Sequence, residues 1–244
     1  MMSTINSTPS QPYFAPPLSA DEGTQSERAE RSKRGIAESS KRWPDGVVTV
    51  AIDIDDPWNR AVVISAIKEW EKHTPALKFK IVLGKQGDIR ISGDATIKGD
   101  WSAIGTDAQR VPKNEPTMHL DRQDDLTLAH NTALHEFGHA LGLKHEHQHP
   151  DRTIKFDKKG LFESFRNAGV EDEDIESQIV QQWPAKDRLA TAYDEHSIMH
   201  YAFGADTTED KKKYPEPTQL SEGDKQIIRL LYTPKKLKQP DTSR

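Results

Sequence analysis

One short segment constrains this chain more than any other feature; it reads HEFGHALGLKH from His135 to His145. His135 and His139 are four residues apart on a predicted helix, so both imidazoles leave the same helix face one turn apart. Gly142 tolerates a positive φ, so the chain can turn sharply there and bring His145 toward the same point. Three neutral imidazoles leave one position of a tetrahedral zinc ion open, as in catalytic zinc sites. Glu136 can reach a water at that position without being a ligand itself.

A histidine pair at helical spacing is often a pair of surface residues that bind no metal. Here five positions fit the arrangement of a metal site: His135, Glu136, His139, Gly142 and His145. They lie on a stretch that is independently predicted to be a helix ending at a glycine, so we favour a metal site. The chain has 10 His and no Cys, and six of these histidines lie between His130 and His149. The lack of Cys excludes disulfides, iron–sulfur clusters, Cys-ligated zinc and a Cys nucleophile.

The 244 residues predict one domain with tails. Only 34% of the residues are hydrophobic, partly because residues 1–42 are rich in Ser, Thr, Pro and charged residues. We expect residues 1–42 to be a disordered or pro-like segment, residues 43–233 to form the folded domain, and residues 234–244 to be a basic flexible tail. The formal net charge of -5 gives no reason to expect nucleic acid or an anionic membrane as a partner.

The N-terminus has no basic start followed by an apolar stretch, so we expect no signal peptide. No apolar run approaches the roughly 20 residues that a membrane span needs. The chain is therefore expected to be cytoplasmic as synthesised. A protein that stays inside the cell and one secreted by a non-classical or dedicated route both fit this pattern.

Hydrophobic periodicity and turn signals predict a mixed sheet with helices packed on it. Helix caps are predicted at Asp56, before Pro57, and at Asp124 or Asp125, and Ser221 and Asp224 have the spacing of a capping box. The predicted strands are 47–52, 77–83, 89–91, 101–106 and 117–120, and the predicted helices are 57–73, 126–141, 174–183 and one that begins at Ser221.

The longer pattern H-E-x-x-H-x-x-G-x-x-H resembles that of the metzincin metallopeptidases, which also carry a Met-containing turn downstream. The sequence has such a candidate in Ser197-Ile198-Met199-His200-Tyr201. Two features resemble the astacin family: Glu146 directly after the third histidine, and the sequence S-I-M-H-Y of the turn. The resemblance runs from Trp43-Pro44-Asp45-Gly46 to Leu231-Tyr232 and so covers nearly all of the predicted domain.

The resemblance implies a zinc-dependent endopeptidase that hydrolyses a peptide or protein substrate through a metal-activated water. It implies the metzincin, zincin-like α+β fold, with a twisted mixed five-stranded sheet, long helices, and an active-site cleft between an N-terminal and a C-terminal subdomain. One catalytic Zn²⁺ ion is expected on three histidine ligands. The ligands that match the family are His135, His139 and His145.

The resemblance also assigns roles to single residues. Glu136 matches the general base, and Tyr201 matches a tyrosine that is a fifth zinc ligand at rest and stabilises the oxyanion during the reaction. Gly142 and Met199 match structural positions, the turn after the helix and the apolar floor below the ligands. Glu146 matches the acid that interacts with the N-terminus freed by activation. The substrate-aligning edge strand is expected near residues 101–104.

This chain departs from the family at several places. The family often has disulfides, but here Asp100 precedes Trp101 where a Cys is common, and His149 stands where the family often has Arg. Family domains begin about ten residues before the matching Trp43, close to Arg34-Gly35 in this chain. Removal of residues 1–34 is therefore one hypothesis, and a solvated basic linker is the other.

Two other functions remain open at this stage: a zinc amidohydrolase acting on a specialised peptide substrate, and a catalytically inactive peptide-binding module. The presence of Glu136 and Tyr201 argues against the inactive module, because a binder needs no general base. The oligomeric state is left open. We interpret His147 and His149 as polar residues of the loop after the third ligand, with a second metal site as the alternative, and His200 as a structural part of the Met turn. No role is assigned to His73, His119, His130 and His196.

Overall fold

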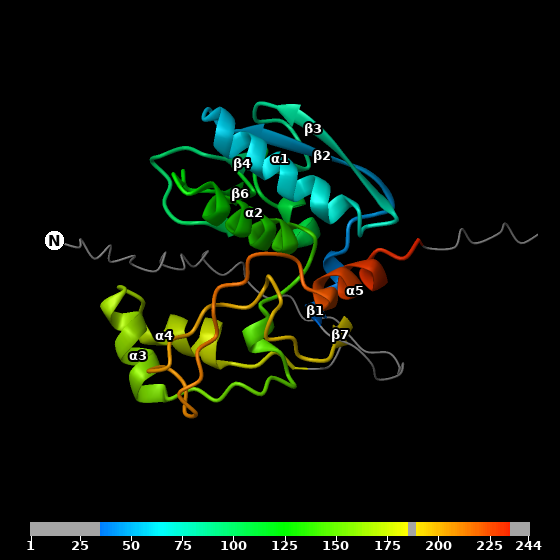
Figure 1. Cartoon of the computed structure of the whole chain (residues 1–244). Helices are drawn as coiled ribbons and strands as arrows, with labels where there is room; N and C mark the ends of the chain where they lie inside the picture. Colours follow the sequence, from blue (N-terminus) through cyan, green and yellow to red (C-terminus); the bar gives the residue numbers. More distant parts are fainter. Residues whose placement is uncertain (1–34, 185–188, 235–244) are drawn as a thin grey trace, which may run out of the picture.

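The computed structural model describes residues 35–184 and 189–234 and has a mixed α+β fold (Figure 1). The strands are β1 Gly35–Ala37, β2 Gly46–Asp53, β3 Leu77–Leu83, β4 Ile89–Ser92, β5 Trp101–Ser102, β6 Met118–His119 and β7 Leu189–Thr191. The α-helices are α1 Pro57–Glu71, α2 Leu126–Ala140, α3 Lys158–Asn167, α4 Asp172–Ile175 and α5 Glu222–Leu231. Short 3₁₀ turns lie at Ser39–Lys41, Gly105–Gln109 and Glu146–Gln148.

The main sheet has five strands in the order β3-β2-β4-β6-β5, which confirms the predicted mixed sheet. β2 pairs in parallel with β3 and β4, and β4 in parallel with β6, whereas β5 pairs antiparallel with β6 and forms one edge. Val48, Val50 and Ile52, which alternate in the sequence, are all buried in the core. Side chains alternate between the two faces of a strand, and on the other face Thr49 is half-buried while Ala51 is buried as well.

Helices α1 and α2 pack against each other and against the sheet (Figure 1). The Asp56 side chain accepts from the backbone N–H groups of Trp58 and Asn59, with Pro57 at the first helical position. Asp125, one of the two predicted candidates, caps α2 in the same way. These caps satisfy backbone donors that the first helical turn leaves free.

Two hydrophobic cores divide the domain. The larger core joins the sheet, α1, α2 and α5, and it contains Trp70, Phe137 and Met199. The smaller core lies in the lower half of Figure 1, where Leu161 of α3 and Ile175 of α4 are fully buried. α2 runs toward the junction of the two halves, which agrees with the predicted N-terminal and C-terminal subdomains.

The predicted start of the domain at residue 43 is wrong by eight residues. β1 pairs antiparallel with β7, and its Ile36 and Ala37 are buried. The backbone N–H of Lys144 donates to Ile36 O, and that of Glu38 donates to Gly142 O. Gly35–Ala37 is a short apolar stretch between polar flanks. Its burial could not be predicted, because its partners come from segments more than a hundred residues away. The predictions for residues 1–34 and 235–244 lie outside the described residues.

Three other elements differ from their predictions. The strand predicted over 101–106 ends at Ser102, because Gly105, with φ +51°, begins a 3₁₀ turn. Helix α3 was not predicted, since it is mostly polar and fully buries only Leu161. The helix predicted over 174–183 begins at Asp172 and continues as a π-helical segment, Glu176–Val180.

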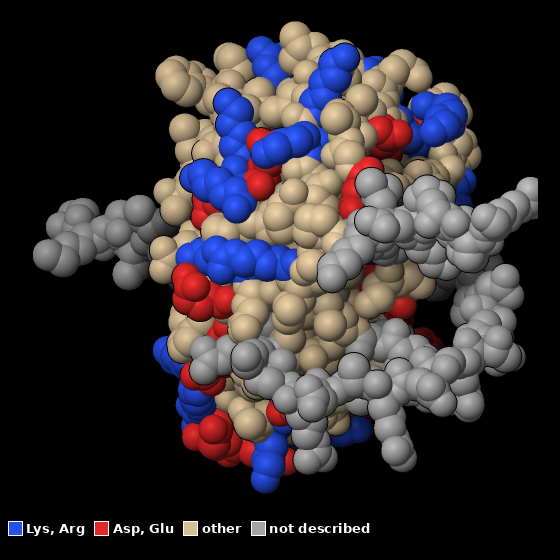
Figure 2. Space-filling view, turned by 90° about the vertical axis from the view of Figure 1, so that its right-hand side faces the viewer, with Lys and Arg blue, Asp and Glu red and all other residues tan. Residues whose placement is uncertain are grey.

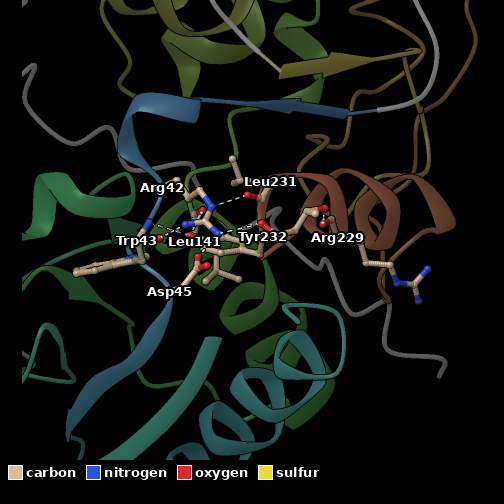
Figure 3. Close-up of polar contacts among 8 residues, drawn as sticks. Arg42, Trp43, Asp45, Leu141, Arg229, Leu231 and Tyr232 are labelled. Atoms are coloured by element: carbon tan, nitrogen blue, oxygen red, sulfur yellow. Dashed lines mark hydrogen bonds and ion pairs between the residues drawn. The ribbon is translucent and has the colours of Figure 1, made fainter. Parts of the chain in front are cut away.

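A polar cluster ties the start of the domain to its last helix and to the end of α2 (Figure 3). The Arg42 guanidinium donates to Leu231 O at 2.6 Å and pairs with the Asp45 carboxylate. The Tyr232 hydroxyl donates to Leu141 O at 2.9 Å, one residue before the turn at Gly142. The Trp43 indole N–H donates to Ala140 O at 2.8 Å, so both ends of the domain contact the end of α2.

None of the described helices is long and apolar enough to cross a membrane. On the face of the molecule shown in Figure 2, Lys and Arg side chains are interspersed with Asp and Glu side chains. The expectations of no nucleic-acid and no membrane partner stay predictions.

Candidate metal centre and active site

Helix α2 presents two histidines on one face, as the four-residue spacing predicts. His135 Nδ1 lies 2.8 Å from Ile198 O, and His139 Nδ1 lies 2.9 Å from Leu143 O. A carbonyl oxygen only accepts hydrogen bonds, so each Nδ1 carries the proton and each Nε2 presents a lone pair. Such outer hydrogen bonds fix the ring orientation of metal ligands.

The turn after α2 brings the third histidine to the other two. Gly142 has φ +99°, and the N–H of Leu143 donates to Gly138 O, which closes the helix. His145 Nε2 lies 3.0 Å from His139 Nε2. One nitrogen from each of His135, His139 and His145 lies within 4.8 Å of the other two.

This nitrogen set fits a zinc ion. Facing lone pairs on neutral imidazoles repel one another, and a cation between them removes that repulsion. Burial lowers the pKa of His135 to about 4 and that of His139 to about 3, and it lowers the pKa of His145 well below its ordinary value. The rings are therefore neutral at physiological pH, as metal ligands must be. All-imidazole coordination suits Zn²⁺.

Glu136 is buried beside these ligands. Its Oε2 has no hydrogen-bond partner within the described part of the chain. Burial raises its pKa well above the ordinary value, and the nearby Asp100 carboxylate raises it further. A buried carboxylate oxygen is normally an acceptor of at least one hydrogen bond. A water or a substrate group at the metal position could donate that bond to Oε2.

Tyr201 lies against the same ligands from the C-terminal half. Its ring centroid is 4.5 Å from that of His145 and 5.7 Å from that of His135. Burial raises the pKa of its hydroxyl, and Glu136 adds to this shift. Tyr201 therefore keeps its phenolic proton and can donate a hydrogen bond beside the metal position.

The Met turn is fastened under α2 and to α5. A Cβ on Gly138 would overlap Met199 Sδ, so the glycine is what lets the turn approach the helix. Asp224 of α5 accepts from Ser197 Oγ at 2.6 Å and from the N–H of Ile198 at 2.8 Å. Ile198 O in turn accepts from His135, so α5 supports a ligand through the turn.

Glu146, directly after the third ligand, also connects to this turn. Its N–H donates to Met199 O, and its Oε1 accepts from the N–H of Asp194 at 2.7 Å. Burial raises the pKa of Glu146 well above its ordinary value, and Asp224 and Asp194 raise it further. The expected contact with a freed N-terminus stays a prediction.

His147 and His149 lie in the segment after the third ligand, as predicted, but their interpretation as ordinary polar residues is wrong, because both are fully buried. The His147 ring packs on His145 and Tyr201, with centroids 5.0 and 4.5 Å apart, and its Nε2 donates to Gln178 O. His149 Nδ1 accepts from the N–H of Asp151. Sequence spacing carried no signal of this burial, because the covering segments are distant in the chain.

A histidine triad on a helix and a following glycine turn, above a Met turn in a two-part α+β domain, define a metzincin-type zinc peptidase. The family model for the Astacin peptidase family matches residues 35–232. The chain therefore belongs to the astacin family, whose zinc metalloendopeptidases use one catalytic zinc.

Solved structures and curated relatives agree with this assignment. A structure of myroilysin matches with a TM-score of 0.75 and 32% identity, covering 83% of this chain and 100% of that chain. Zinc metalloproteinase nas-8 of Steinernema carpocapsae is 28% identical over 69% of this chain and 36% of its own length. Zinc metalloproteinase nas-3 of Caenorhabditis elegans is 28% identical over 78% of this chain and 64% of its own length. The chain thus spans less than two thirds of these curated relatives.

Proposed function

We propose that this chain is a zinc-dependent endopeptidase whose substrate is a peptide or protein. The observation that carries the proposal is the convergence of three histidine nitrogens within 4.8 Å of one another, beside a buried glutamate without a partner on one oxygen. His135, His139 and His145 would hold the ion. When bound, zinc supplies a Lewis acid that polarises a carbonyl and activates water near neutral pH.

Glu136 is the general base of the proposed reaction. Its carboxylate accepts a proton from the attacking water and returns that proton to the amine that leaves when the peptide bond breaks. The raised pKa of Glu136 supports this role, because a base works best when its pKa lies near the operating pH. Burial also keeps bulk water from competing for the carboxylate.

Tyr201 stabilises the oxyanion that forms on the substrate carbonyl. Its protonated hydroxyl donates a hydrogen bond where negative charge develops, a contribution that grows toward the transition state. Its ring packs against both His145 and His147, which limits the positions that the hydroxyl can take. A role as fifth zinc ligand at rest belongs to the same proposal, and so do the structural roles of Gly142, Glu146 and Met199.

The first prediction concerns Glu136→Gln, tested on casein or gelatin. We expect the variant to bind one zinc per chain and to lose at least about 100-fold in hydrolysis rate, the contribution of a positioned general base. Glu163→Gln is the matched control, because Glu163 is an exposed residue of α3. A chelator should abolish wild-type hydrolysis, and added zinc should restore it.

The outcomes separate the alternatives. Undiminished hydrolysis by Glu136→Gln would contradict the assignment of the base. Hydrolysis of a specialised peptide alone, with casein and gelatin left intact, would favour the amidohydrolase. Zinc and peptide binding by the wild type without any hydrolysis would favour the inactive binding module. The cytoplasmic origin and the non-classical or dedicated secretion route stay separate proposals, tested by locating the protein in fractionated cells.

A further inference from the structure

The loop between β4 and β5, residues 93–100, rests on a buried histidine of the neighbouring strand β6. His119 has no exposed surface. Its Nδ1 lies 2.7 Å from Gly99 O, and its Nε2 lies 3.0 Å from Asp94 O. Asp94 is two residues after β4 and Gly99 is two residues before β5, so both ends of the loop meet on one imidazole.

The two partners of His119 decide which form of the ring fits. Both are carbonyl oxygens, which only accept hydrogen bonds. A neutral imidazole has one N–H, so its other nitrogen would point a lone pair at an oxygen. The imidazolium donates at both nitrogens, and its hydrogen bonds are charge-assisted. The geometry therefore selects the protonated ring.

Carboxylates surround this position and can balance a buried positive charge. Asp94 and Asp100 of the loop lie close to His119, and Asp121 follows β6. Burial raises the pKa of Asp100 to about 6, while the N–H of Asp121 and the His119 ring act in the opposite direction. Two further charged groups interact with these carboxylates: Lys85 with Asp94, and Glu136 of α2 with Asp100.

The end of the loop is fastened at further points just before β5. The N–H of Asp121 donates to Asp100 Oδ1 at 2.7 Å, and the N–H of Gly99 donates to Asp121 Oδ2 at 2.9 Å. The Trp101 ring, the first of β5, stacks on the His119 ring with centroids 6.3 Å apart and an interplanar angle of 25°. The position of β5 therefore depends on the position of His119.

We propose that His119 is a positioning residue, which as an imidazolium holds the loop 93–100 and thereby the edge strand β5 in place for substrate. The proposal rests on the proposed function and on the role that the family resemblance implies for the edge strand β5, which would align the substrate backbone by strand pairing. A side chain that donates from one atom only would keep one of the two loop contacts and lose the other. Substrate affinity then falls, while Glu136 and the zinc ligands stay in place.

The protonation of His119 can be measured without any activity. We expect ¹⁵N nuclear magnetic resonance of the zinc-loaded Glu136→Gln protein at about pH 6 to show both ring nitrogens of His119 as protonated N–H groups. The signal is assigned by its absence in Glu136→Gln/His119→Gln. A single protonated nitrogen under these conditions would overturn the proposal.

Kinetics test the effect on substrate. His119→Gln removes the charge and offers donors at one atom only, so we expect KM to rise about three- to tenfold with little change in kcat. His196→Gln is the control, because its side chain is 78% exposed. An unchanged KM in His119→Gln would refute the proposal.

The two measurements distinguish the possible failures. If the wild type hydrolyses nothing, the proposed function fails, and the ¹⁵N spectrum still decides the state of His119. If His119→Gln does not fold, the ¹⁵N spectrum of the Glu136→Gln protein, which keeps the His119 ring, decides the question.

Discussion

At the scale of single residues, Gly138 shows how tightly the metal-site helix is packed. The residue lies inside α2, where glycine is a poor helix former. A Cβ at this position would overlap Met199 Sδ and lie 3.3 Å from Trp70 Cζ2. The glycine is therefore required by the approach of the Met turn and not by the helix.

We expect Gly138→Ala to lower the free energy of unfolding by about 1–2 kcal/mol. Overpacking of a core costs about 1–3 kcal/mol, and the better helix propensity of Ala returns up to about 1 kcal/mol. Urea unfolding of the zinc-loaded protein measures the difference. In a Met199→Ala background the same substitution should cost less, because the overlapping atoms are gone. An equal cost in both backgrounds would contradict the contact.

The sequence predicted the three ligands because their positions depend on one helix and one turn. His135, His139 and His145 need only local geometry and a glycine with positive φ to converge. The burial of His147 and the double carbonyl contact of His119 depend on segments distant in the chain. No local pattern reports such contacts, so these two histidines read as ordinary polar residues in the sequence.

At the scale of elements, α5 connects the Met turn to the rest of the domain. The capping box of Ser221 and Asp224 is present as predicted. Asp224 also accepts from Ser197 Oγ and the N–H of Ile198, which the capping pattern did not predict. One buried carboxylate therefore starts a helix and anchors a loop that holds a metal ligand.

Asp224→Ala should lower the free energy of unfolding by about 3 kcal/mol and speed the release of zinc. It leaves the Ser197 hydroxyl and the N–H of Ile198 without their acceptor in a buried place, at about 1–3 kcal/mol for each group, and it removes the acceptor of the half-buried N–H of Ser221. Thermal unfolding and zinc transfer to a fluorescent chelator measure the two effects.

Two further variants control for the loss of a helix cap alone. Asp224→Asn keeps an acceptor oxygen and should lie between wild type and Ala. Asp125→Ala removes only the exposed cap of α2 and should cost about 1 kcal/mol. If Asp224→Ala behaves like Asp125→Ala, the anchoring role of Asp224 is wrong.

The sheet and the two long helices could be predicted because each carries its own periodicity and caps. β1 could not be predicted, since a three-residue strand is stable only through its partners β7 and the segment after Gly142. Helix α3 could not be predicted either, because it contributes only Leu161 to the fully buried core. Elements that lack a buried face of their own become visible only in the assembled domain.

At the scale of the whole molecule, the two halves together bury the metal ligands. His135 and His139 come from α2 in the larger core, whereas Tyr201 and its neighbours pack against the smaller one. Burial by both halves lowers the pKa of His135 to about 4 and that of His139 to about 3. The pKa of an isolated histidine is near 6.5, so the fold lowers the pKa of both ligands.

This burial predicts how zinc affinity depends on pH. Protons compete with zinc only where the pH approaches the pKa of a ligand. Because the folded-state pKa values lie below 6.5, these rings remain neutral as the pH falls through that value, and competition begins only near about pH 4. We therefore expect the zinc affinity of the folded protein to change less than tenfold between about pH 7.5 and about pH 5.5. Competition with a chelator, with its own pH dependence calibrated, measures this affinity.

A synthetic peptide that spans residues 131–149 is the control. It carries the same ligands without the surrounding cores, so its histidines titrate near 6.5. Its affinity should fall by up to about tenfold per histidine for each pH unit below that value. Circular dichroism must show that the protein stays folded at about pH 5.5, since unfolding would expose the ligands. A folded protein that loses zinc as steeply as the peptide would contradict the idea that the two packed halves keep the site free of protons.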